Sequence, residues 1–330
     1  MKSALILGGT QFIGRNLVER MLGIEGFAIT LFNRGRTGGE LFPGVERIIG
    51  DRRTKEIERI ASKDWDIVVD LSCYFPDDLK STLRNLKGRP ERYVFVSTCS
   101  VYEPNDTHIL RNEEARVLGC TRAEYADDSP ATYGNRKAEC ERILAASGLD
   151  HVVFRPALVY GPYDPTDRLY YWLHQVKCKD ELLLPDNGER KFSVTYVQDL
   201  VRAIVRSMEQ PTRSKVYNTI TVPETSIGEI VRVTSALLQR SVPVRNASPS
   251  FLKGHGVRPW LDMPLWIDGD HFTYSNQRIK DELGLVPTDR LESIRATLDH
   301  FDKRGWPQPG YGMSDGQRRE LLGLCARSMD

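Results

Sequence analysis

The chain has 330 residues, a length that favours two domains, or one large sheet domain carrying a smaller one, over a single ordinary core. Lysine and arginine number 46 against 45 aspartate and glutamate, and this net charge of +1 argues against nucleic acid or an anionic membrane as the main partner. The apolar runs are strand-sized, and the first follows directly after Met1, so we expect a cytoplasmic protein without a signal peptide or transmembrane helix. The six cysteines form no CxxC pair, so we expect reduced thiols and no metal site.

The first predicted element is a strand over 3–7, followed by a glycine turn and a helix over 15–22. The first turn of such a helix presents unpaired N–H groups, and together with the helix dipole they favour a bound diphosphate. We therefore expect a dinucleotide at this turn; a tight turn without a ligand is the alternative. The expected cofactor-binding residues here are Gly8, Thr10, Gln11, Phe12, Ile13 and Gly14.

A second strand over 27–32 ends in Asn33 and Arg34, where many dinucleotide folds carry an acidic residue for the adenosine ribose. An arginine here can instead accommodate a 2′-phosphate, so NADP(H) is favoured and NAD(H) is the alternative. The alternative interpretation is that Arg34 is solvated and binds no ligand. The third strand, 45–49, delivers Asp51 and Arg52, polar groups that we expect near the adenine edge.

Strands and helices alternate through the first hundred residues. A helix capped by Thr54 precedes a buried strand over 66–71, and a helix opening at Pro76 precedes a fifth strand over 93–97. This order predicts an α/β fold with a doubly wound (Rossmann) parallel sheet, whose ligands bind beyond the carboxyl ends of the strands. A polar loop is expected from Glu103 to Pro130.

Tyr133 and Lys137 are four residues apart in the next predicted helix, which runs to about residue 147. This spacing puts both side chains on one helix face, where the ammonium is expected to lower the pKa of the phenol toward the range of a general base. An ordinary surface pair is the alternative interpretation.

The second half of the chain is less regular. We expect a strand over 151–155, helices over about 164–177, 197–208, 226–239, 276–283 and 291–303, and a strand over 216–219. The segment 251–270 is a lid or, in our preferred interpretation, a packed loop. We assign 1–160 to a dinucleotide-binding domain to which 193–222 return, and 161–192 with 223–330 to a smaller, interleaved α/β substrate-binding domain.

Four ordered motifs resemble the extended short-chain dehydrogenase/reductases, specifically the NAD(P)-dependent sugar epimerase/dehydratase group. They are Gly8-Gly9-Thr10-x-Phe12-Ile13-Gly14, Ser97-Thr98-x-x-Val101-Tyr102, Tyr133-x-x-x-Lys137 and Arg155-Pro156…Tyr160-Gly161-Pro162. The resemblance implies that Tyr133 is the catalytic acid/base, that Thr98 holds the reacting oxygen and that Lys137 serves both the phenol and the cofactor ribose. It also implies that Leu71, Ser72 and Pro156 flank the cofactor.

Departures from that group narrow the reaction and the substrate. Cys99 and Ser100 replace the acid pair of the 4,6-dehydratases, so dehydration is disfavoured. Leu158 and Phe192 replace two usual anchors of a nucleotide diphosphate, and Gln11 replaces a glycine of the turn. Three cations are candidate replacements for the missing anchors: Arg168, Lys191 and His174.

The sequence therefore predicts an NAD(P)-dependent epimerase or reductase acting on a secondary alcohol of a sugar, sugar nucleotide or sugar-like molecule. Tyr74, Ser100, Arg168 and His174 are the expected substrate contacts, and 160–191 with 251–270 form the outer wall of the cleft. A homodimer is left open. The alternatives are an RNA-binding protein, since the turn with Asn33-Arg34-Gly35 also resembles a branch that includes chloroplast stem-loop RNA-binding proteins, and a cofactor sensor without turnover.

Overall fold

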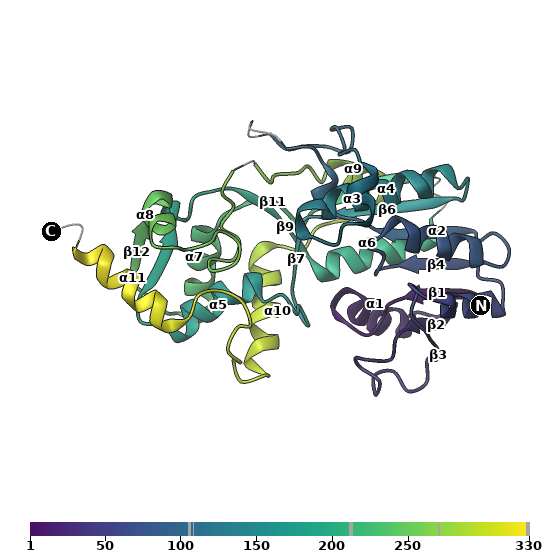
Figure 1. The fold of residues 1–330 in the computed structure, drawn as a ribbon. Coiled ribbons are helices and arrows are strands. Elements are labelled where there is room, and N and C mark those ends of the chain that lie inside the picture. Colours follow the sequence, from purple (N-terminus) through teal and green to yellow (C-terminus); the bar gives the residue numbers. More distant parts are fainter. Residues whose placement is uncertain (105–106, 108, 211–213, 270, 328–330) are drawn as a thin grey trace.

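The computed structural model describes residues 1–104, 107, 109–210, 214–269 and 271–327. Seven strands form its main sheet in the order β10-β6-β5-β4-β1-β2-β3, and every neighbouring pair is parallel (Figure 1). The predicted doubly wound α/β fold is confirmed. Its strands are β1 (Lys2–Leu7), β2 (Phe27–Asn33), β3 (Glu46–Ile49), β4 (Ile67–Asp70), β5 (Arg92–Val96), β6 (His151–Pro156) and β10 (Lys215–Thr219).

Alternate residues of the strands feed two cores, one on each face of the sheet. Ala4 and Ile6 of β1 pack with α1 (Phe12–Leu22), α6 (Val197–Glu209) and α9 (Gln277–Leu283). Leu5 and Leu7 pack with the 3₁₀ helix η1 (Lys55–Ser62), α2 (Pro76–Asn85) and α4 (Tyr133–Ala146). Both faces are covered, which is why the strands are apolar almost throughout.

Most of the remaining elements form a second lobe with a core of its own, at the left of Figure 1. Two small sheets belong to it: β11 (Val222–Thr225), β9 (Phe192–Tyr196) and β7 (Leu158–Tyr160) form one, and β12 (Val244–Ala247) and β8 (Leu182–Pro185) the other. Its helices are α5 (Arg168–Cys178), η4 (Asp186–Gly188), α7 (Ile227–Leu238), α8 (Pro249–Gly254), α10 (Arg290–Asp302) and α11 (Asp315–Arg327).

The domain division stays a prediction. Within 193–222, the elements divide between the main sheet and the second lobe. There α6 and β10 join the main sheet, whereas β9 pairs with β7 and β11 in the three-stranded sheet. The segment 251–269 is packed: Leu252, Met263 and Trp266 are buried in the lobe's core. Residue 270, which we grouped with this segment, lies outside the described residues.

The expected loop from Glu103 to Pro130 is only partly a loop, and its residues 105, 106 and 108 lie outside the described part of the chain. It contains α3 (Arg122–Ala126), which starts with a reciprocal capping box between Thr121 and Glu124. Two further 3₁₀ turns, η2 (Cys99–Val101) and η3 (Pro130–Thr132), lie at either side of the loop. The periodicity missed α3 because five residues are too few to show it.

The chain reverses its direction of travel across the sheet at β1 and β4. From β1 it proceeds to β2 and β3 on one side, and then to β4, β5 and β6 on the other. Ligands of doubly wound sheets bind beyond the carboxyl ends of the strands at such a switch point. Among the described residues, no helix is long and apolar enough to cross a membrane, and no group of three or more acidic, histidine or cysteine side chains is arranged to hold a metal ion.

Candidate active site

The glycine turn follows β1 at the switch point. Gly8 and Gly9 have φ values of +121° and +100°, which side chains other than hydrogen rarely allow. A Cβ on Gly14 would lie 2.6 Å from the Gly9 nitrogen, so only glycine lets α1 approach the turn this closely. Gln11 is the N-cap of α1, yet its side chain does not cap the helix. The first N–H groups of α1 therefore remain available to an anion, and the turn fits a dinucleotide diphosphate.

Other predicted cofactor residues lie around this turn. The Asn33 side chain donates from Nδ2 to the Gly8 carbonyl (3.4 Å) and accepts at Oδ1 from the Gly35 N–H (2.9 Å), so it fixes the end of β2 against the turn. Arg34 is exposed. On the other side of β1, the Ser72 hydroxyl donates to the Leu7 carbonyl (3.1 Å), and Leu71 lies within van der Waals reach of Gly8. Pro156 ends β6 at the same edge of the sheet.

Arg52 is turned away from the position that we expected for it. Its guanidinium forms a two-point ion pair with the buried Asp70 carboxylate, at 2.7 and 2.9 Å, and also donates to Thr82. The Tyr93 hydroxyl donates to the same carboxylate (2.8 Å). Arg52 is therefore engaged in the interior, where it joins the ends of β3 and β4, while Asp51 is half-buried and accepts from the Arg53 N–H.

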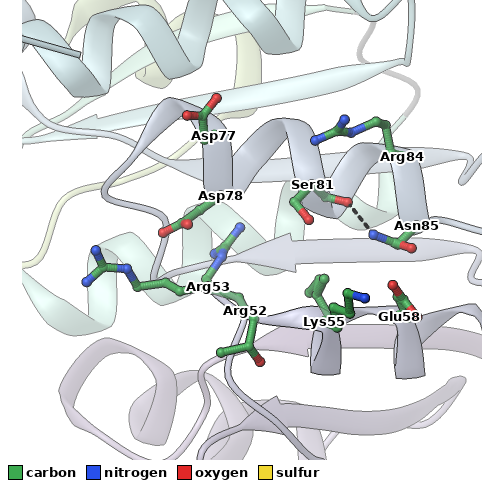
Figure 2. Close-up of a pocket in the computed structure, with 11 residues that line it drawn as sticks. Arg52, Arg53, Lys55, Glu58, Asp77, Asp78, Ser81, Arg84 and Asn85 are labelled. Atoms are coloured by element: carbon green, nitrogen blue, oxygen red, sulfur yellow. Dashed lines mark hydrogen bonds between the residues drawn. The ribbon is translucent and has the colours of Figure 1, made fainter. Parts of the chain in front are cut away.

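A groove of about 470 Å³ opens beside Arg52, between η1 and α2 (Figure 2). Four cationic and three carboxylate side chains line it, so the groove has no single sign of charge. Its lining residues are Arg52, Arg53, Thr54, Lys55, Ile57, Glu58, Asp77, Asp78, Ser81, Arg84 and Asn85.

Thr98 and Tyr133 come together at the carboxyl end of β5. Thr98 is the N-cap of η2: its hydroxyl accepts from the Ser100 N–H (3.1 Å) and donates to the Ser100 hydroxyl (3.2 Å). The Thr98 side chain also lies close enough to Tyr133 to act on the pKa of its phenol. The Tyr74 ring lies 6.2 Å from the Tyr133 ring and is half exposed. The predicted acid/base, its oxygen-holding threonine and two expected substrate contacts thus share one surface.

Gly134 explains why the two segments approach so closely. A Cβ on Gly134 would overlap the Ser100 carbonyl oxygen, so α4 lies directly against η2 only because this residue is glycine. Gly134 was not among the predicted site residues. Its position inside a predicted helix is the signal that could have identified it, because glycine there destabilises a helix by about 1 kcal/mol relative to alanine and therefore indicates a packing or functional role.

Lys137, one helical turn after Tyr133 on α4, is buried rather than exposed. Its ammonium donates to the Val96 and Cys73 carbonyls, at 2.7 and 2.9 Å. Burial raises the pKa of Tyr133 to about 12, and the hydrogen bond with Thr98 and the positive charges of Arg168 and Arg136 only partly oppose this increase. The expected lowering of the Tyr133 pKa by Lys137 is therefore wrong for the protein alone, because desolvation of the phenolate dominates.

The three side chains proposed to replace the missing diphosphate anchors differ in their burial and in their ion pairing. The His174 side chain lies in the core of the second lobe with only 1% of its surface exposed, and neither ring nitrogen has a hydrogen-bond partner among the described residues. The expected substrate contact at His174 is therefore buried. Lys191 pairs with Glu229 (2.7 Å), which also holds Arg290. Arg168 is half-buried at the start of α5, and its charge acts on Tyr133.

This site is that of a dinucleotide-binding α/β protein. A glycine turn follows β1 at the switch point, and a threonine, a tyrosine and a lysine lie near the end of β5, which β4 separates from β1. Residues 76–222 match the profile of the NAD dependent epimerase/dehydratase family. Over these residues, which make up a little under half of the chain, the sequence is similar to this family.

The related proteins of named function share little sequence identity with this chain. A UDP-glucose 4-epimerase of Vibrio cholerae is 24% identical over 269 residues, which cover 72% of this chain and 76% of the relative. The chloroplast stem-loop binding protein of 41 kDa b from Arabidopsis thaliana is 27% identical over 221 residues, 62% of this chain. That match spans only about half (54%) of the plant protein. A solved UDP-glucuronic acid 4-epimerase from Bacillus cereus, in complex with NAD, shares the fold with a TM-score of 0.71 at 17% identity, over 92% of this chain and all (100%) of the other.

Proposed function

We propose that this chain is an NAD(P)-dependent epimerase or oxidoreductase that acts on a secondary alcohol of a sugar, sugar nucleotide or sugar-like substrate. The observation that carries the proposal is that Thr98 acts on the Tyr133 phenol, while Lys137 is buried on the same helix as Tyr133 and only β4 separates β5 from β1 and its glycine turn. The family of residues 76–222 and the similar epimerases support it.

The residues have distinct roles in this proposal. The turn at Gly8–Gly14 would hold the diphosphate of the cofactor, whose nicotinamide would supply hydride transfer at the substrate carbon. Thr98 donates a hydrogen bond to the reacting oxygen, and Tyr133 moves the hydroxyl proton. Because the pKa of Tyr133 is about 12, the phenol is protonated at neutral pH in the protein alone and is ready to donate a proton to a carbonyl. To accept a proton it needs additional positive charge nearby.

Removing the phenol tests this assignment. Tyr133→Phe should lower turnover by about 10²- to 10⁴-fold, the usual contribution of a general acid/base, and leave dinucleotide binding unchanged. Tyr125→Phe is the matched control. Tyr125 lies on α3, and its hydroxyl donates to the Asp77 carboxylate on α2. Full turnover in Tyr133→Phe would remove the phenol from the mechanism.

The fate of the cofactor separates the two reactions. With UDP-glucose or UDP-glucuronic acid as substrate and catalytic NAD(P) in deuterated water, epimerisation by hydride return retains the carbon-bound hydrogen and needs no stoichiometric cofactor. Net oxidation or reduction consumes the cofactor one for one.

NADP(H) is the favoured form of the cofactor within this proposal, because the exposed Arg34 at the end of β2 offers a cation where a carboxylate would select NAD(H). Arg34→Asp should shift the ratio of the two dissociation constants toward NAD(H), and Arg36→Asp is the neighbouring control. A wild-type protein that already prefers NAD(H) would refute this reading of Arg34.

RNA binding is a second candidate, supported by the similarity to the chloroplast stem-loop binding protein. The balance of 46 cationic and 45 anionic residues provides no net attraction to phosphate backbones. Titration of a labelled stem-loop RNA, with and without NAD(P), distinguishes the candidates: binding with no sugar turnover would favour the RNA role. A cytoplasmic location and a homodimer stay predictions.

A further inference from the structure

Tyr163 lies where the two lobes meet, and contacts from both of them hold it. It belongs to the loop between β7 and α5, and the Arg15 guanidinium of α1 covers its ring at 3.7 Å from the ring centroid. The carbonyl of the preceding residue, Pro162, accepts from the Asn16 side chain of α1 (3.0 Å). This loop is therefore fastened to the helix that follows the glycine turn.

The backbone of Tyr163 is strained. Its φ of +67° lies in the left-handed region, which a residue with a bulky side chain rarely adopts. Such a conformation persists only where the surrounding contacts fix it. Loss of those contacts therefore lets Tyr163 relax to an ordinary conformation, and the loop then has a second position.

His300 of α10 provides a contact that fixes this conformation. Its Nε2 accepts from the Tyr163 N–H (3.4 Å), and its ring meets the Tyr163 ring edge-on, with 4.9 Å between the centroids. An imidazole nitrogen accepts a hydrogen bond only while it carries no proton. The contact therefore requires a neutral His300, and protonation turns the acceptor into a second donor that faces the Tyr163 N–H.

The charges around the His300 ring oppose its protonation. Burial lowers the pKa of His300 below its ordinary 6.5, and nearby cations add to this effect. The cations are Arg304, Arg15 and Lys303, and the carboxylate that opposes them is Glu19, which pairs with Arg15 (2.9 Å). Once released from these contacts, the ring regains its ordinary pKa. Release of the loop therefore becomes easier as the pH falls below 6.5.

We propose that His300 is a pH-sensitive latch between the two lobes. Neutral His300 keeps the Tyr163 ring under Arg15 and so holds the second lobe on α1. Protonated His300 releases Tyr163 from its strained conformation, and the contact between the lobes loosens in mild acid. The latch requires neither the cofactor nor the reaction proposed above, so its test is independent of both.

Hydrogen–deuterium exchange of the full chain tests the latch, with mass spectrometry of peptides that contain Tyr163. Exchange is compared at about pH 7.5 and about pH 5.5, after correction for the chemical exchange rate and without cofactor. Protection of these peptides should fall by about 5- to 10-fold at the lower pH, because one pH unit below 6.5 gives about a ten-fold excess of charged over neutral imidazole in the released ring. Peptides from β5 should stay equally protected, which excludes unfolding of the whole chain.

Variants of His300 separate the charge of the ring from its shape. His300→Gln keeps a hydrogen-bond acceptor that gains no charge, so its protection should not depend on pH. His300→Lys carries a permanent charge and should be poorly protected at both pH values. His255→Gln, at an exposed histidine that follows α8, is the matched control and should respond as the wild type does.

Asp164 titrates in the same loop and needs its own variant. Its Oδ1 accepts from the N–H and the hydroxyl of Thr166 (2.9 and 2.7 Å), and burial raises its pKa to about 6. Protonation removes the cost of this buried charge, so Asp164 would increase protection in acid, the opposite sign. Asp164→Asn should therefore retain the loss of protection that His300 causes.

Three results would overturn the latch: wild-type protection that does not change with pH, a loss in acid that persists in His300→Gln, or a loss that disappears in Asp164→Asn. Arg304→Met leaves the ring intact and removes an exposed cation near it. At low salt, this variant should move the midpoint of the transition to a higher pH, and a midpoint that does not rise would also contradict the assignment to His300.

Discussion

Asp164 is a buried carboxyl group, and its ionisation should lower the free energy of unfolding at neutral pH. Burial raises its pKa from the ordinary 3.8 to about 6, although Thr166 and Arg168 act in the opposite direction. Asn at this position keeps an Oδ1 that accepts both bonds from Thr166, and it removes the charge. Asp164→Asn should therefore stabilise the folded protein wherever the native carboxyl is ionised.

The size and sign of this effect follow from the two pKa values. Each pKa unit corresponds to about 1.36 kcal/mol, so the burial cost is about 3 kcal/mol once the carboxyl is fully ionised. Below pH 3.8 the group is protonated in both the folded and the unfolded protein, and the cost vanishes. Between 3.8 and about 6 the unfolded chain loses its proton first, so the free energy of unfolding falls as pH rises.

Urea unfolding of wild type and Asp164→Asn at several pH values provides the measurement. We expect the variant to be more stable by about 3 kcal/mol near pH 7.5, by about half of that near pH 5, and by almost nothing near pH 3. Asp128→Asn, at an exposed aspartate, is the control and should show no such trend. A difference that is absent at neutral pH, or that does not decline with acid, would refute the assignment of a buried, ionised carboxyl.

The remaining predictions concern packing that the structure makes specific. Gly14→Ala should abolish NAD(P) binding in a folded protein because its Cβ meets the Gly9 backbone, whereas Gly39→Ala, in open space, should bind normally in the same titration. Gly134→Ala should lower turnover on the order of 100-fold by moving Tyr133 about 1 Å from Thr98, with cofactor affinity as the internal reference. Arg52→Met should reduce the free energy of unfolding in urea by about 3–5 kcal/mol, since it leaves Asp70 buried without its cation; a loss below about 1 kcal/mol would contradict the described ion pair.

The sequence determined the fold class and the main sheet. Strand-sized apolar runs and helical periodicity are local signals, so β1 to β6 and the helices packed on them were predictable. The same applies to the glycine turn: Gly8 and Gly14 are required by local backbone geometry and close helix packing, and both requirements are visible in the spacing of the motif. The short strands β7, β9, β11 and β12 were missed because three to five residues pair with distant partners and have no periodicity of their own.

Only the tertiary structure decided which charged groups are free to act. Arg52 and Arg168 look equivalent in the sequence. Yet Asp70 pairs with Arg52 in the interior, whereas Arg168 is half-buried and its Nε donates to the neutral Thr166 hydroxyl. His174 is buried and Lys191 is paired for the same kind of reason, since burial and ion pairing depend on residues far away in the chain. The sequence specified Tyr133 and Lys137 through their helical spacing, but the pKa of the phenol depends on the surface that the fold removes from water, and the spacing of two residues carries no information on that surface.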